Sequence, residues 1–155
     1  MKRQFILRSL QNFESLVHFL EANWPQLSRE ETPIEVKCSI YQKSRTNDQL
    51  AVLWAGILQP MSDQAWIGGR QYSAETWHEF MKKTHIPAIA ADQTEPGTHV
   101  KNDSKIWEYM PDGERQFCGS TAMLTKRGMA EYITRCEAYA VSELGVKLPA
   151  NPRDL

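Results

Sequence analysis

The stretch from Lys43 to Trp77 places the strongest constraint on how this chain can fold. From Leu50 to Leu58 the apolar residues recur at spacings of three and four, which predicts an amphipathic helix. Thr46, Asn47 and Asp48 precede this pattern, and the side-chain oxygen of each can cap the helix start. Pro60 lacks a backbone N–H and clashes with the preceding turn, so the helix is expected to end or kink there.

Basic residues stand at both ends of this predicted helix. Lys43 and Arg45 precede its start, which would place a cationic loop against the positive end of a helix, a good place to hold a phosphate. After the helix, a turn carries Trp66 and Arg70, and Ser73 caps a second helix. The same cations also fit an ordinary solvated loop, so this pattern leaves both interpretations open.

The N-terminal part alternates between two kinds of pattern. Gln4 to Arg8 reads as a short strand, and an amphipathic helix follows that is expected to end before Trp24 and Pro25. From Ile34 to Tyr41 apolar and polar residues alternate strictly, which predicts a half-buried strand. The chain therefore opens with a predicted strand, helix and strand.

The C-terminal half contains two further predicted elements. The helix capped by Ser73 is expected to end near His85, and a long polar loop follows from 86 to 104. A turn signal at 111–113 predicts a hairpin. The segment from Lys126 to Leu144 predicts the longest helix, capped by Thr125 and closed by a left-handed Gly145.

Length and charge limit the organisation. The 155 residues with 41% hydrophobic content fit one domain of class α+β, with approximate lobes at 1–85 and 105–155 joined by a polar loop. Its parts are the strand-helix-strand opening, a long central helix, a short hairpin and a long C-terminal helix. The net charge is -1, so binding to a polyanion requires basic residues to cluster locally.

Cysteine usage indicates a reducing compartment. Cys38, Cys118 and Cys136 are odd in number and widely spaced, which argues against a disulfide framework and a zinc ribbon. The apolar run near the N-terminus is short and is interrupted by Arg8, so we expect neither a signal peptide nor a membrane span. The sequence thus predicts a cytoplasmic protein.

No strong catalytic motif is present. The histidines show no metal-ligand spacing, and the glycines at 68 and 69 form neither a P-loop nor a dinucleotide fingerprint. A small metal-dependent nuclease built from His99, Asp103 and Glu108 remains an alternative, as does a protein-interaction dimer that does not bind DNA.

Several basic residues lie near aromatic ones along the chain. The pairs are Arg45 with Trp54, Trp66 with Arg70, and Lys105 with Trp107. Proteins that bind single-stranded nucleic acid combine cations that follow the phosphates with rings on which bases stack. These pairs favour a nucleic-acid-binding function.

Two longer motifs extend beyond these local patterns. The first is SRTNDQLAVLWA followed by WIGGRQYSAETWHEFMK, with Asp48-Gln49 opening a helix and Gly69-Arg70 in a turn. The second is GSTAMLTKRGMAEYI, which ends further on in Gly145-Val146 and includes the Ser120-Thr121 pair. Both motifs resemble the phage NinB/Orf family of recombination proteins and match it in order and separation, so the resemblance covers most of the chain.

The resemblance implies a small, intertwined homodimer that acts as a recombination mediator. It would bind single-stranded DNA, with duplex DNA bound more weakly, and the host single-strand-binding protein, and it would help to load a recombinase or annealing protein. We expect no catalytic residues, no metal and no cofactor. The cytoplasm would be that of a bacterial host, with the gene carried by a phage or prophage.

The resemblance also implies where DNA is bound. Some family members carry an arginine just after the Ser-Thr pair, where this chain has Ala122-Met123, and the positive charge arrives later at Lys126 and Arg127. The expected DNA-binding residues are Lys43, Arg45, Asn47, Gln49, Arg70, Ser120, Thr121, Lys126 and Arg127.

Overall fold

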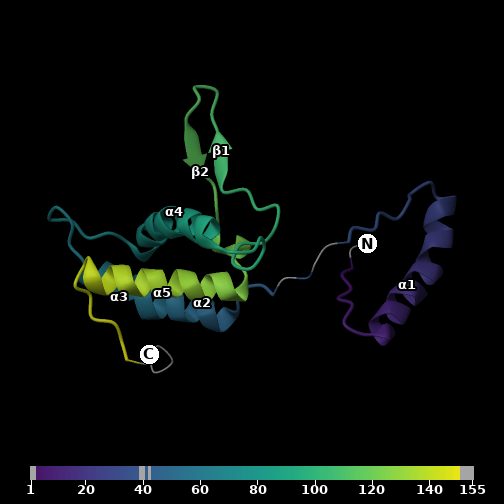
Figure 1. Ribbon diagram of the computed structural model, residues 1–155, viewed down its shortest axis with the longest axis horizontal. Helices are drawn as coiled ribbons and strands as arrows, with labels where there is room; N and C mark the ends of the chain where they lie inside the picture. Colours follow the sequence, from purple (N-terminus) through teal and green to yellow (C-terminus); the bar gives the residue numbers. More distant parts are fainter. Residues whose placement is uncertain (1–2, 39–40, 42, 151–155) are drawn as a thin grey trace. The chain divides into compact units, whose positions relative to one another are not determined.

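The computed structural model describes residues 3–38, 41 and 43–150 and divides the chain into two compact units (Figure 1). The first unit comprises residues 1–41 and the second residues 42–155. Long helices and a two-stranded antiparallel sheet confirm the α+β class. Along the described part of the chain, none of the helices is long and apolar enough to cross a membrane.

Helix α1, Leu10–Arg29, forms about half of the first unit. The Ser9 hydroxyl accepts a hydrogen bond from the Asn12 N–H and caps the helix start. The predicted end before Pro25 is wrong, because the helix continues through this proline. At the end of the helix, Thr32 donates from both its N–H and its hydroxyl to the Leu27 carbonyl, one of the last carbonyls of α1.

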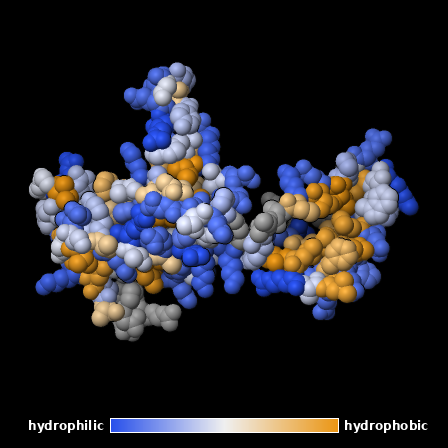
Figure 2. All heavy atoms as spheres, in the orientation of Figure 1, coloured by the Kyte–Doolittle hydropathy of each residue, from blue (hydrophilic) through white to orange (hydrophobic). Residues whose placement is uncertain are grey.

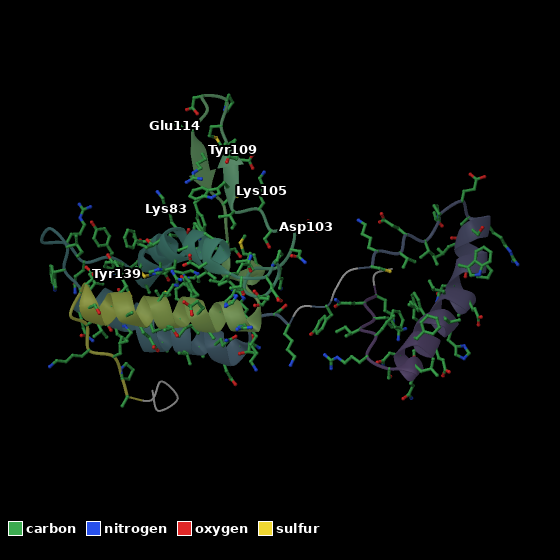
Figure 3. All side chains as sticks on the ribbon, viewed as in Figure 1. Lys83, Asp103, Lys105, Tyr109, Glu114 and Tyr139 are labelled. Carbon is green, nitrogen blue, oxygen red and sulfur yellow. The ribbon has the colours of Figure 1, made fainter. Side chains whose placement is uncertain are left out.

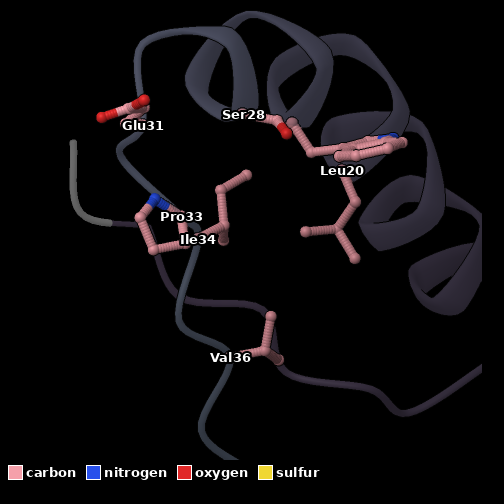
Figure 4. Close-up of a pocket in the computed structure, with 7 residues that line it drawn as sticks. Leu20, Ser28, Glu31, Pro33, Ile34 and Val36 are labelled. Carbon is pink, nitrogen blue, oxygen red and sulfur yellow. The ribbon is translucent and has the colours of Figure 1, made fainter.

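The segments on either side of α1 are not strands in the structure. Over residues 3–8, 32–38 and 41 the backbone takes no strand assignment; the remainder of the second predicted strand, Ser39 and Ile40, lies outside the described residues. A strand needs a neighbour to complete its ladder of hydrogen bonds, and alternation alone does not supply one. Ile34 and Val36 instead line an open hollow beside Leu20 of α1 (Figure 4).

Three helical layers form the core of the second unit. Helix α2, Asn47–Leu53, continues as the π-helix η1, Trp54–Leu58, and as α3, Gln59–Gln64. This rod packs against α4, Ala74–Asp92, and α5, Lys126–Ser142, which also pack against each other (Figure 1). The largest fully buried side chains all come from this unit: Leu53, Ile57, Leu58, Met61, Met81, Ile86, Ile89, Leu124, Met129, Tyr132 and Cys136.

The central helix does not end at Pro60, where the sequence predicts an end or a kink. The Gln59 N–H donates to the Trp54 carbonyl, five residues back, so the bonding pattern is already irregular when Pro60 is reached. A π turn is wider than an α turn, and it accommodates a residue without an N–H at lower cost than a regular turn would. The helix therefore runs on to Gln64.

Helix α4 also extends beyond its expected end near His85 and passes through Pro87 to Asp92. Ile86 is 0% exposed and Ile89 is 1% exposed, so both sides of the proline are fixed in the core. Burying two isoleucine side chains stabilises by roughly 3–6 kcal/mol, which matches or exceeds the ~3 kcal/mol cost of an internal proline. Part of the predicted loop is therefore helical.

The hairpin and the C-terminal helix agree with the sequence-based predictions. Strands β1, Trp107–Tyr109, and β2, Arg115–Phe117, pair antiparallel around a turn that contains Gly113 at φ 86°. The Thr125 hydroxyl accepts from the Gly128 N–H and caps α5. Beyond its end, Gly145 takes φ 64° and donates to the Val141 carbonyl.

A half-buried histidine lies where the three layers meet. The His78 ring centroid is 4.7 Å from that of Trp54, and the Tyr132 hydroxyl lies 3.3 Å from His78 Nδ1. Burial, reinforced by the nearby Lys82, lowers the pKa of His78 to about 4. The imidazole is therefore neutral at pH 7 and is part of the packed core.

We expect the free energy of unfolding to fall as the pH drops from 6.5 towards 4. In this window an unfolded histidine binds a proton while native His78 does not, so acid favours the unfolded state. Urea unfolding across this range should show a shallower pH slope for His78→Gln than for the unchanged protein. Equal slopes would contradict the buried neutral state, because carboxylate titration contributes to both proteins alike.

Candidate nucleic-acid interface

All the predicted site residues except Arg70 lie in one region of the second unit. Two segments far apart in sequence meet there and carry these residues: 43–49, which leads into α2, and 120–127, which leads into α5. A third segment, 98–101, joins them. We call this region, made of these three segments, the basic junction.

Backbone and side-chain hydrogen bonds hold the two main segments together. The Lys126 N–H donates to the Lys43 carbonyl at 2.9 Å, and the Gln49 amide donates to the Lys126 carbonyl at 2.9 Å. Gln49 also completes a capping box with Thr46, in which each side chain bonds the other residue's backbone N–H. Gln49 thus fixes both the start of α2 and its distance from α5.

Arg45 connects the same two segments through its side chain. Its guanidinium donates to the Thr121 hydroxyl, which is only 3% exposed. Ser120, beside it, caps the short 3-10 helix η2, Thr121–Met123, by accepting from the Ala122 N–H. Arg45 is therefore held in a defined, half-buried position, and Thr121 positions it from below the surface.

Two helix starts lie side by side in the basic junction, and each carries the positive end of a helix dipole. Lys43, Lys126 and Arg127 are exposed around them. Asn47 is exposed in the first turn of α2, beside Asp48, the acidic residue of that turn. Apart from this carboxylate, fixed cations and helix dipoles add up to a positive local potential in a chain with no net positive charge.

Lys101 is a member of this region that the sequence did not reveal. Its ammonium donates to the Ser44 hydroxyl at 2.7 Å, and its backbone N–H donates to the Met123 carbonyl at 2.8 Å. Lys101 lies in the predicted polar loop, 57 residues from Ser44 in sequence. No local pattern brings such distant positions together, so only the folded chain could identify it.

Gly128 explains why the third segment can approach so closely. A Cβ atom at this position would lie 1.8 Å from the His99 carbonyl oxygen. That oxygen also accepts the Thr125 N–H at 2.9 Å, and the Thr125 hydroxyl donates to the Thr98 carbonyl at 2.7 Å. Only glycine leaves room for the backbone of this segment against the first turn of α5.

Arg70 lies in a different part of the second unit. It closes a tight turn with Ile67, with Gly68 and Gly69 at φ 59° and 75°. This turn follows α3, whose last residue, Gln64, bonds the backbone of Lys147 beyond the C-terminal end of α5. Helix α5 has 17 residues and is therefore about 25 Å long, and it separates this end from the basic junction.

One predicted pairing of a cation with a ring is replaced by another. The guanidinium of Arg115 lies over the Trp107 ring, 4.0 Å from its centroid, while Lys105 forms an ion pair with Glu108. The pairing of Lys105 with Trp107 is therefore wrong. Arg115 lies directly opposite Tyr109, and from this diagonal position its side chain reaches the Trp107 ring.

The residues considered for a metal-dependent nuclease do not gather in the structure. Within the described ranges, no group of three or more His, Cys, Asp and Glu side chains is placed to hold a metal ion. The ring of His99 bonds the Thr98 hydroxyl, Glu108 pairs with Lys105, and Asp103 occupies a turn at φ 62°.

The fold and this region define an α+β protein whose cations converge on two helix starts. The family model described as NinB protein matches residues 1–148, and the chain belongs to this family. Membership supports a function in phage recombination. A solved structure described as "Structural Genomics, NinB" is 24% identical, covers 99% of this chain and 93% of its own, and has a TM-score of 0.44. A search of the curated proteins gives no match.

Substituting Gln49 by alanine tests how the basic junction is held. We expect Gln49→Ala to lower the free energy of unfolding by about 1–2 kcal/mol, because it removes the capping box and the bond to the Lys126 carbonyl. Asn47→Ala, an exposed neighbour in the same turn, serves as the control and should stay within about 0.5 kcal/mol. Equal urea midpoints for the two variants would exclude this role.

Proposed function

We propose that this protein is a recombination mediator that binds single-stranded DNA at the basic junction and helps to load a recombinase or annealing protein. The observation that carries the proposal is the convergence of five cations on two adjacent helix starts. These are Lys43, Arg45, Lys101, Lys126 and Arg127. Helix starts and cations both favour phosphate groups, so their combination supports a polyanion as the ligand.

The proposed binding does not depend on base sequence. Exposed lysines such as Lys43 and Lys126 would neutralise phosphates and release their counterions, which makes affinity depend steeply on salt. Arg45 is less mobile, because Thr121 holds it, and would fix the path of the strand past the junction. The protein would act by binding alone, without a catalytic step or a cofactor.

The proposed setting follows from the family. In the cytoplasm of a bacterial host, a phage or prophage protein of this kind meets single strands already covered by the host single-strand-binding protein. We propose that it binds this protein as well as DNA, so that a recombinase gains access to the strand. Arg70 lies far from the basic junction and would contact only a longer strand or a second protein.

We expect labelled single-stranded DNA to bind more tightly than its duplex in fluorescence anisotropy, with affinity falling as salt rises. Lys43→Ala/Lys126→Ala should weaken binding and reduce the slope of log affinity against log salt by about 1.4, since each lost phosphate contact removes about 0.7.

The matched control removes two exposed lysines elsewhere in the second unit, Lys83→Ala/Lys147→Ala, and should keep the original slope. If neither single strand nor duplex binds at low salt, DNA is not the ligand. If both double variants lose the same slope, binding is diffuse and the basic junction is not its site.

We further propose that the protein acts as a homodimer in which a second copy covers the apolar face of α1. Leu10 is 71% exposed and Trp24 is 55% exposed, and α1 contributes no buried residue to its own unit. Figure 2 shows hydrophobic side chains gathered over this helix. The described residues of this unit, 3–38 and 41, form no buried core, and a unit of about forty residues is at the lower limit of size for independent stability, so it requires a covering surface.

Sedimentation velocity tests this dimer. We expect the unchanged protein to sediment as a dimer and Phe13→Ser/Trp24→Ser to sediment as a monomer, because both side chains lie on the apolar face. Gln11→Ser/His18→Ser changes the opposite side of α1 and should remain dimeric. A monomer for the unchanged protein, or a dimer for the Phe13/Trp24 variant, would refute this interface.

A further inference from the structure

The β1–β2 hairpin stands out from the helices of the second unit and has two unlike faces (Figure 1). Trp107 pairs with Phe117, and Tyr109 pairs with Arg115. Directly opposed residues of an antiparallel pair lie on the same face, so these four side chains share one face of the hairpin. The remaining pair, Glu108 with Gln116, lies on the other. We call the first the aromatic face.

The aromatic face is anchored at its base and open towards its tip. The Phe117 and Trp107 rings meet edge to face with centroids 6.0 Å apart, and Phe117 packs against the core. A Cβ atom at Gly119 would lie 2.7 Å from the Phe117 ring, so glycine allows this ring to lie on the backbone. Tyr109, further along the strand, is 70% exposed (Figure 3).

The charges of the hairpin are sorted between its faces. Arg115 is the one charged member of the four side chains on the aromatic face, and its guanidinium carbon lies over Trp107, 4.0 Å from the ring centroid. Glu108 belongs to the other face, where it pairs with Lys105. The Asp112 carboxylate accepts the Glu114 N–H within the turn. The aromatic face thus combines rings with a cation and carries no carboxylate.

The hairpin that carries this face leads directly into the basic junction along the chain. Strand β2 ends at Phe117, and Ser120 follows three residues later, a span of at most about 10 Å. The backbone between them is tied down by the Cys118 N–H, which donates to the Ile106 carbonyl at 2.8 Å. A strand whose phosphates lie at the basic junction can therefore bring its next bases to the hairpin.

We propose that the aromatic face is a base-stacking platform for single-stranded DNA, an inference that rests on the proposed function and extends its site. Bases stack on Tyr109 and on the Trp107–Arg115 pair, while the phosphates remain with the cations of the basic junction. Rings and guanidinium groups stack on any base, so the platform adds affinity without sequence preference. It also favours single strands, because the bases of a duplex are already stacked on one another.

Two probes of equal length separate stacking from electrostatics: labelled oligothymidine, and a labelled abasic strand that has the same phosphates but no bases. Tyr109→Val keeps a β-branched residue suited to a strand and removes the ring. We expect it to weaken oligothymidine binding at least about fivefold, with no change for the abasic strand. Tyr109→Phe keeps the ring and should bind oligothymidine like the unchanged protein. Gln116→Val makes the matched change on the opposite face and should bind like the unchanged protein.

Each other result would overturn the proposal. Equal oligothymidine affinity for Tyr109→Val and the unchanged protein would mean that the face serves another partner, such as a protein. An equal loss on both strands would mean that Tyr109 acts on the structure and not on bases, as would a lowered melting temperature. If the unchanged protein binds neither strand, the proposed function itself fails. The two failures can therefore be told apart: absence of binding refutes the proposed function, whereas binding that does not depend on Tyr109 refutes only the stacking platform.

Discussion

The packing of α2, α4 and α5 is the constraint on which the rest of the second unit depends, because it holds two helix starts together. The Lys126 N–H reaches the Lys43 carbonyl, and Gln49 bonds the next backbone group of the same segment. Closing a loop of about eighty residues is entropically costly, so such bonds persist only where burial elsewhere holds the helices together. The core between α2, α4 and α5 does this, with Leu53 and Met129 fully buried. Packing therefore sets the position of every cation in the basic junction.

The arrangement is electrostatically unfavourable in the absence of an anion. Lys126 and Arg127 stand in the first turn of α5, where the dipole already presents positive charge, and Lys43 lies beside them. Each such placement costs a few tenths of a kcal/mol at an exposed site. A bound phosphate would attract both the cations and the helix starts, and this attraction would offset the repulsion between them. The electrostatic repulsion within the region is thus the physical reason to expect an anionic ligand there.

In the proposed site, the basic junction contributes electrostatic attraction and the hairpin contributes base stacking. Cations attract a strand at long range and lose strength with salt, whereas stacking acts only at contact and is insensitive to salt. Because Tyr109 and Lys126 belong to segments joined through η2, both contributions would act on one strand. A near-neutral chain can in this way bind a polyanion with a small number of well-placed groups.

Local chemistry by itself determined several elements of this protein. The turn signal at 111–113 predicted the hairpin, and Thr125 and Gly145 marked the ends of α5, because turns and caps depend on a few neighbouring residues. The helix ends predicted near Pro60 and Pro87 were wrong. The energetic cost of a proline inside a helix is local, whereas the burial of side chains that offsets this cost comes from distant parts of the chain. Only the tertiary structure decided that Arg45 of the basic turn bonds Thr121 and that Arg70 lies elsewhere. It also placed Lys101 beside Ser44. These relations join positions that are tens of residues apart, and they follow from how helices pack, which no local pattern contains.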